Sequence, residues 1–219
     1  MRWAVCLLAM ALAFGQTGGE SGVAIQVVLE KRADSKWSTV DPHLVLHGKD
    51  EIRFRFRSNR SGFLYVVNRE PGGDHTWLFP TPETGEHNVV EANKDYVIPA
   101  TDGVFVLAEK PGYETTYWIL SPEELRPRRA LEPDSNAPVQ NTLIPRCDEG
   151  GGLIARGPCT DKKAGARRFS SPGSPQWFES AAPLQSRDLK FKSNNERSSV
   201  SLGRLFDAPV IYEFRIAHN

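Results

Sequence analysis

The sequence predicts an all-β protein: a small antiparallel β-sandwich, immunoglobulin-like or barrel-like, with a long, largely irregular insertion before the last strand. Residues 51–57 alternate polar and apolar side chains with the period of two that is typical of a strand. Short β-branched or aromatic runs recur about every ten residues between 23 and 120, and turn residues separate them. The 18 Gly and 16 Pro residues in a chain of 219 favour turns over long helices.

The expected strands follow from these runs and from a second alternating stretch near the C-terminus. In chain order they cover residues 23–29, 43–46, 51–57, 63–68, 75–79, 89–90, 96–98, 103–108, 115–120, 200–206 and 209–216. Turn residues at 59–62, 93–95 and 110–112 predict that the strands flanking each turn pair as hairpins. Residues 121–125 predict one short helix, capped by the serine at its start. We expect the last strand to pair with the sheet built by residues 23–120, because a lone strand is not stable.

Residues 1–15 have the layout of a secretory signal peptide. Arg2 gives a positive start, residues 4–14 form an uncharged run, and the small residues Ala13 and Gly15 stand before the expected cleavage site. The apolar run is too short to span a bilayer, so we expect no transmembrane anchor after removal of the signal. The expected location is therefore secreted or periplasmic. The alternative interpretation is a buried N-terminal helix.

Removal of the signal leaves two cysteines in the chain. Cys6 is lost, and Cys147 and Cys159 remain. An even count in an exported chain predicts a disulfide between them. A metal site is the competing interpretation, but the two thiols have no neighbouring histidine and lack the close spacing of a zinc pattern. A catalytic dithiol more often has the spacing C-x-x-C.

Residues 126–199 differ from the rest of the chain in composition. The segment is rich in Pro, Gly and Ser and carries 13 Lys and Arg against 8 Asp and Glu. Such a segment buries too little apolar surface to offset its conformational entropy, so we expect a flexible basic insertion. The β-sandwich domain is then formed by residues 23–125 and 200–217. Over the whole chain, 27 basic residues balance 27 acidic ones, which argues against nucleic acid as a partner.

No motif in the sequence points to catalysis, a cofactor or a metal. The patterns G-x-S-x-G, G-x-x-x-x-G-K-[ST] and G-x-G-x-x-G do not occur. His43 and His47 are four residues apart, which on a strand separates them too far to share one metal ion. We therefore expect a protein that is not an enzyme, with no catalytic, cofactor-binding or metal-binding residue. A hydrolase whose site is assembled from distant residues is one alternative.

The expected function is non-catalytic binding of a protein or a polysaccharide of the cell envelope. The possible binding surface comprises Arg55, Arg57, Arg60 and Trp77. Clustered arginines hold anions, although arginines on a strand more often form a solvated face. A second alternative is a carbohydrate-binding module that uses exposed aromatic side chains. Its candidate residues are Trp37, Trp77, Trp118, Tyr65 and Tyr117. Most of them lie in alternating strands, which favours a place in the core over an exposed binding platform.

Residues 51–66, with the sequence EIRFRFRSNRSGFLYV, resemble the signature of the bacterial domain of unknown function 4384 family. Further pieces that match in order and spacing are Trp77-Leu78-Phe79-Pro80, Asn88, Tyr96-Val97-Ile98-Pro99 and Ile119-Leu120-Ser121. The resemblance covers roughly residues 40–125. It implies a small β-rich domain of bacterial, often exported or multidomain, proteins, and it brings no known catalytic residue. Residues 104–116 depart from the Gly- and Pro-rich stretch expected in the family.

Overall fold

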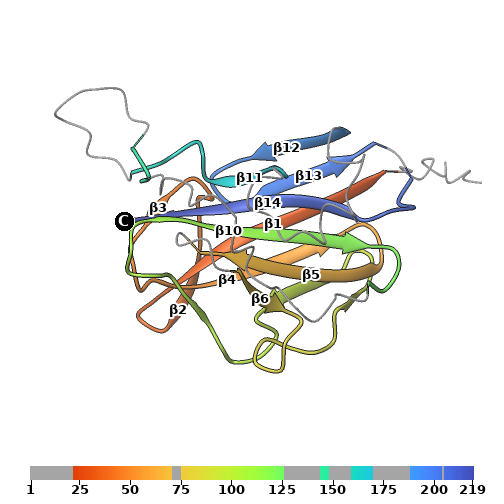
Figure 1. Ribbon diagram of the computed structural model, residues 1–219, viewed down its shortest axis with the longest axis horizontal. Coiled ribbons are helices and arrows are strands. Elements are labelled where there is room, and N and C mark those ends of the chain that lie inside the picture. Colours follow the sequence, from red (N-terminus) through yellow and green to blue (C-terminus); the bar gives the residue numbers. More distant parts are fainter. Residues whose placement is uncertain (1–21, 71–74, 126–143, 148–158, 170–187, 204) are drawn as a thin grey trace, which may run out of the picture.

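The computed structural model forms two packed β-sheets and confirms the predicted fold class. It describes residues 22–70, 75–125, 144–147, 159–169, 188–203 and 205–219 (Figure 1). The predicted signal peptide and the whole loop between the two cysteines, residues 148–158, lie outside the described residues. Within the described part of the chain, no helix is long and apolar enough to cross a membrane.

One sheet, here called sheet 1, has the strand order β12-β13-β1-β4-β8, with β2 beside β1 and β9 beside β4. All its pairings are antiparallel. The strands are β1 (Val23–Ala33), β2 (Lys36–Val40), β4 (Glu51–Ser58), β8 (Asp95–Ile98), β9 (Phe105–Val106), β12 (Leu189–Ser193) and β13 (Ser198–Leu202).

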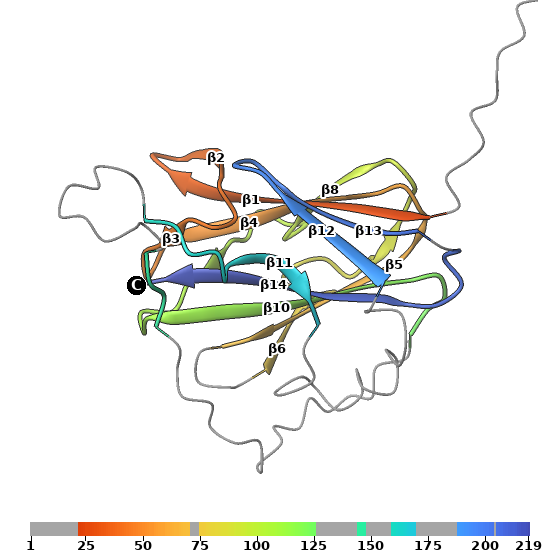
Figure 2. The ribbon, with the colours of Figure 1, turned by 90° about the horizontal axis from the view of Figure 1, so that it is seen from above.

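The second sheet, sheet 2, has the order β11-β14-β10-β5-β6 and packs against sheet 1 as a separate layer (Figure 2). Its strands are β3 (Val45–Leu46), β5 (Gly62–Arg69), β6 (His75–Phe79), β7 (Val89–Val90), β10 (Gly112–Ser121), β11 (Gly165–Arg168) and β14 (Val210–His218). The short strand β3 runs parallel to β14, and the other pairings are antiparallel. The predicted pairing of the C-terminal strand is confirmed, because β14 pairs with β10 over its whole length.

The three predicted hairpins are wrong, because each turn carries the chain from one sheet to the other. The strands β4 and β5 lie in different sheets, as do β7 and β8, and β9 and β10. At the first of these turns, the Asn59 side chain accepts a hydrogen bond from the backbone N–H of Ala24 at 2.7 Å, and the Asn59 N–H donates to the Ala24 carbonyl at 3.0 Å. The turn is therefore fastened to β1 of sheet 1, and the next strand is free to enter sheet 2.

The hairpins that do form join β1 to β2, β5 to β6 and β12 to β13. In the first hairpin, Ala33 pairs with Lys36, and the two turn residues Asp34 and Ser35 have φ angles of 49° and 63°. Positive φ at both central positions is the geometry of a type I′ turn, which matches the right-handed twist of paired strands. The pair Asp-Ser is not a typical sequence for this turn, so the turn has little local signal in the sequence.

The short helix predicted at residues 121–125 is also wrong. Strand β10 runs through Ser121, and a bend follows it. The Ser121 hydroxyl still accepts a hydrogen bond from the N–H of Glu123 at 3.2 Å, which is a local contact that caps and bends share. Beyond the bend, the Leu125 N–H donates to the Tyr65 hydroxyl at 2.8 Å, which ties the segment to β5.

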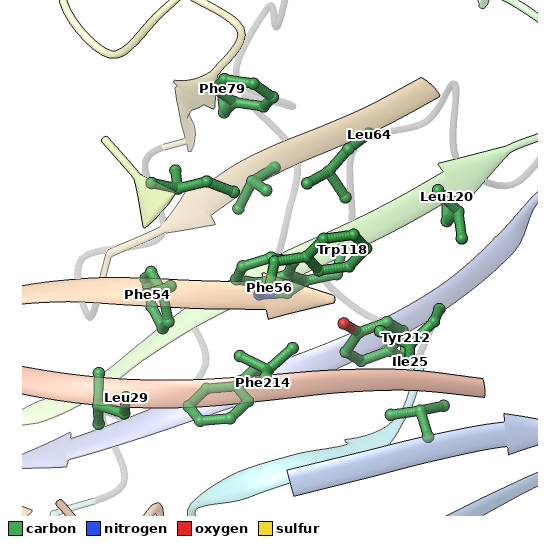
Figure 3. Packing of buried hydrophobic residues seen from close by; sticks show 14 of the residues in the cluster. Ile25, Leu29, Phe54, Phe56, Leu64, Phe79, Trp118, Leu120, Tyr212 and Phe214 are labelled. Carbon is green, nitrogen blue, oxygen red and sulfur yellow. The ribbon is translucent and has the colours of Figure 1, made fainter. Parts of the chain in front are cut away.

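The main core lies between the two sheets and is dominated by aromatic rings (Figure 3). Phe54 and Phe56 of β4 point toward Trp118 of β10, whose ring centroid lies 5.2 Å from that of Phe54 and 5.8 Å from that of Phe56. Tyr212 and Phe214 of β14 complete the cluster. The alternation of residues 51–57 thus predicts the correct buried face of β4.

Sheet 2 is buried on its outer face as well. Tyr65, Tyr117 and Ile119 point away from the main core and are at most 2% exposed. Phe169 and Trp77 pack against this second cluster. The outer face of sheet 1, in contrast, carries exposed side chains along β1 and β4. This difference leaves the outer face of sheet 1 as the accessible sheet surface of the described residues.

Cys147 and Cys159 form the predicted disulfide. The Cys159 carbonyl accepts a hydrogen bond from the N–H of Val45 at 2.8 Å, so the bridge is fastened to β3 at the border of sheet 2. Close by, the Asp161 N–H donates to the carbonyl of His43 at 2.8 Å. A disulfide of this kind is typical of proteins from oxidising compartments. The segment 126–199 also contributes β11, β12 and the start of β13 to the two sheets, so its described parts are built into the sandwich.

Replacing Asp161 with asparagine is expected to lower stability by about 1–3 kcal/mol at pH 7, because Asp161 is a buried hydrogen-bond acceptor. Its carboxylate accepts hydrogen bonds from the Tyr113 hydroxyl and from the N–H groups of Arg146 and Lys163. Burial alone would raise the pKa of Asp161, but these hydrogen bonds outweigh it and lower the pKa. The ionised form therefore stabilises the fold above about pH 4, and this contribution is lost as the pH falls through the lowered pKa.

Thermal unfolding at pH 7 and at pH 3 measures this effect. We expect the melting temperatures of the wild type and of Asp161→Asn to differ at pH 7 and to differ less at pH 3, which lies below the ordinary pKa of an aspartate. A difference that is the same at both pH values would contradict the assigned role of the carboxylate.

Candidate functional site

A polar groove lies on the exposed outer face of sheet 1. The alternation that buries Phe54 and Phe56 directs Arg55 and Arg57 of β4 to this face. The register places Gln26 of β1 opposite Arg57. The groove has a volume of about 590 Å³. We call it the basic groove; it is lined by Gln26, Val28, Thr39, Arg55, Phe56, Arg57, Asn93, Asp95, Glu196 and Arg197.

The arginines of the basic groove are only loosely held by neighbouring side chains. Arg57 Nη1 lies 3.3 Å from Asp95 Oδ2, and both side chains are about half exposed. Arg55 Nη1 lies 3.7 Å from Glu30 Oε1, while the other oxygen of Glu30 lies 2.5 Å from Arg53 Nε. The Glu30 carboxylate is thus engaged mainly by Arg53. Because a guanidinium has five N–H donors, Arg55 and Arg57 retain donors that a ligand can use.

Arg197 supplies a third guanidinium from the opposite side of the groove. It follows β12 in the chain and precedes β13, and its Nη1 lies 3.5 Å from the Gln26 side-chain oxygen. In the same sheet, Lys192 of β12 pairs with Ser199 of β13, and Ser199 pairs with Gln26. Residues paired directly across a sheet share one face, so Lys192 extends the positive charge beyond the groove.

The structure brings together two of the four residues predicted to form a binding surface. Arg55 and Arg57 lie side by side in the basic groove. Arg60 lies beyond the end of β4, where its Nε donates to the carbonyl of Gly22 at 3.1 Å. Trp77 lies on β6 of sheet 2, with its ring 6.5 Å from that of Tyr65.

Sequence reasoning missed the groove residues that come from distant segments. Arg197 and Glu196 fall in the segment predicted to be irregular, and no local pattern places them beside β1. The alternation of Lys190 and Lys192 around a phenylalanine is the one local signal that predicts strand β12. Thr39 is placed in the groove by the β1–β2 hairpin. The turn of this hairpin does not have a typical sequence, so the position of Thr39 is not evident from the sequence.

The aromatic residues considered for a sugar-binding platform do not share one surface. Trp118, Tyr65 and Tyr117 are buried, at most 2% exposed. Trp37 lies on the outer face of sheet 1, where the guanidinium of Arg53 sits 4.3 Å above its ring. The two half-buried tryptophans, Trp37 and Trp77, belong to different sheets. Within the described residues, no group of three or more His, Cys, Asp or Glu side chains is arranged to hold a metal ion.

The fold and the groove define a class of protein: a β-sandwich with a polar, predominantly basic groove on the exposed face of one sheet. Residues 46–124 match the family model described as Domain of unknown function (DUF4384), which confirms the resemblance found in the sequence. The match covers less than half of the chain and spans β4 to β10, so it includes Arg55 and Arg57 but not β1, β13 or β14. No curated protein and no solved structure gives a significant match to the chain.

Proposed function

We propose that the protein is an exported, non-catalytic binding module that holds an acidic segment of a cell-envelope protein in the basic groove. The observation that carries the proposal is the convergence of three incompletely paired arginines on the exposed face of sheet 1. Arginine is enriched in protein interfaces, and its guanidinium binds carboxylates through two parallel hydrogen bonds. The signal-like residues 1–15 and the disulfide support the exported location.

The charge pattern of the groove favours a peptide over a uniformly anionic polymer. Asp95 and Glu196 line the groove together with the three arginines. A polymer that carries a negative charge on every unit is repelled by these two carboxylates. A peptide with several acidic residues and neutral or basic residues between them satisfies both kinds of side chain. Gln26 and Asn93 add amide groups that hydrogen-bond to a peptide backbone.

Replacing all three groove arginines with glutamine is expected to weaken binding of an acidic peptide about tenfold. Each exposed ion pair contributes about 0.2–1 kcal/mol, so the loss of three pairs amounts to roughly 1.4 kcal/mol. The measurement is fluorescence anisotropy with a labelled peptide of alternating glutamate and serine, using the variant Arg55→Gln, Arg57→Gln, Arg197→Gln.

The matched control removes three positive charges away from the groove, with Lys36→Gln, Lys49→Gln and Lys110→Gln. These side chains are exposed, and the control is expected to bind the peptide within twofold of the wild type. Equal weakening by the two triple variants would contradict the proposal, because it would indicate a response to net charge alone. Displacement of the peptide by a polyuronate that itself binds more tightly would assign the groove to a polysaccharide.

A further inference from the structure

A second cavity lies between the two sheets, on the opposite side of β4 from the basic groove. Its volume is about 360 Å³, within the range of small-molecule sites. Ile52 and Phe54 of sheet 1 form one wall, and β5, β6, β10 and β14 of sheet 2 form the other. We call it the inter-sheet cavity; it is lined by Ile52, Phe54, Asn68, Glu70, Thr76, Leu78, Val104, Phe105, Val106, Leu107, Ala108, Glu114, Thr116 and Ile216.

Two carboxylates face this largely apolar cavity. Glu114 is 5% exposed, and its Oε2 accepts a hydrogen bond from Asn68 Nδ2 at 2.6 Å. The backbone N–H of Ala108 also hydrogen-bonds to the Glu114 carboxylate. Burial raises the pKa of Glu114, and the nearby charge of Glu70 raises it further. Ionisation of Glu114 is therefore costly while no cation lies beside it.

The nearby His218 side chain does not supply that cation. His218 is fully buried, and its Nε2 lies 3.7 Å from Glu114 Oε1, which is too long for a hydrogen bond. Burial lowers the pKa of His218, so its ring is neutral at pH 7. Within the described residues, neither ring nitrogen has a hydrogen-bond partner, and the same holds for Asn68 Oδ1. Buried polar atoms without partners are rare, and of these three the Asn68 oxygen belongs to a residue that lines the cavity.

We propose that the inter-sheet cavity binds a small amphiphilic primary amine. An alkylammonium group has three N–H donors, which match the Glu114 carboxylate, the Glu70 carboxylate and Asn68 Oδ1. Its alkyl chain packs against the apolar walls, such as Phe54, Leu78 and Ile216. This site is separate from the basic groove, and it prefers the opposite sign of charge.

Isothermal titration calorimetry with n-hexylammonium tests the inference, with n-hexanol and n-hexanoate as ligands of equal chain length. We expect the ammonium to bind more tightly than the alcohol and the carboxylate to bind least. Glu114→Gln preserves the size of the side chain and is expected to weaken binding of the ammonium at least tenfold, because it removes a buried charge partner. Thr76→Phe fills the exposed mouth of the cavity and is expected to abolish binding of all three ligands.

The triple arginine variant of the basic groove serves as the matched control and is expected to bind n-hexylammonium as the wild type does. If the acidic peptide does not bind, the expected binding of n-hexylammonium is unaffected. The two proposals can therefore be tested, and rejected, separately. Absence of binding, equal affinity for the ammonium and the alcohol, or an unchanged affinity in Glu114→Gln would each overturn the inference, provided that thermal unfolding shows the variant to be folded.

Discussion

Replacing Trp118 with alanine is expected to lower the free energy of unfolding by about 4 kcal/mol and the melting temperature by roughly 10 °C. Trp118 is fully buried at the centre of the main core, where its ring contacts those of Phe54, Phe56 and Tyr212. Its indole N–H donates to the Thr116 hydroxyl at 2.8 Å. Truncation therefore leaves a large cavity between the sheets and removes one of the two hydrogen bonds of the buried Thr116 hydroxyl, which also donates to the Phe214 carbonyl. Thermal and urea unfolding followed by circular dichroism measure the loss.

The matched control is Trp77→Ala. Trp77 lies on the edge strand β6 of sheet 2 and is only partly buried. Because less apolar area is lost there, we expect a decrease of less than half that of Trp118→Ala. Equal losses for the two variants would contradict the placement of the core between the sheets.

Replacing both Cys147 and Cys159 with serine is expected to lower the free energy of unfolding by about 3 kcal/mol. The bridge closes a loop with 11 residues between the two cysteines, and loop closure of that length restricts the unfolded chain by about this amount. We expect the destabilisation to be greatest at the border of sheet 2, because the Cys159 carbonyl accepts a hydrogen bond from the N–H of Val45 in β3. Thermal unfolding of the wild type and of the double variant measures the effect.

Reduction provides the control for the disulfide. A thiol reductant should lower the melting temperature of the wild type to that of the double serine variant and leave the variant unchanged. The intact mass of the untreated protein should lie about 2 Da below that of the reduced protein, by the chemistry of thiol oxidation. A wild-type melting temperature that does not respond to reduction would contradict a stabilising role for the bridge.

The positions of the strands can be predicted because each strand has a local sequence signal. Which strands pair with each other cannot be predicted in this way. The alternation of residues 51–57 reflects one buried and one exposed face, which any sheet pairing of β4 preserves. The turn at residues 59–62 reverses the chain equally well within a sheet or between sheets. Its destination depends on the bonds of Asn59 to Ala24, a residue 35 positions away in the sequence. The same limit explains why all three predicted hairpins are wrong.

The residues of the candidate sites also divide into those with a local sequence signal and those placed by strand pairing. Arg55 and Arg57 are two residues apart on one strand, so the period of two predicts that they share a face. Arg197 reaches them only through the register of β13 and β1. Glu114 gave no signal as an inward-facing carboxylate, because β10 is buried on both faces and shows no polar–apolar alternation. The inward position of Glu114 follows from the packing of the two sheets against each other.

The central claim is that the outer face of sheet 1 binds an acidic peptide, and mapping of backbone amide shifts by NMR tests it most directly. On titration of the ¹⁵N-labelled protein with the peptide of alternating glutamate and serine, we expect the largest shifts in β1 and β4, around Gln26, Val28 and Arg57. Addition of salt should reduce them, because exposed charges are screened. Shifts that are absent, or confined to sheet 2 around Trp77, would contradict the claim.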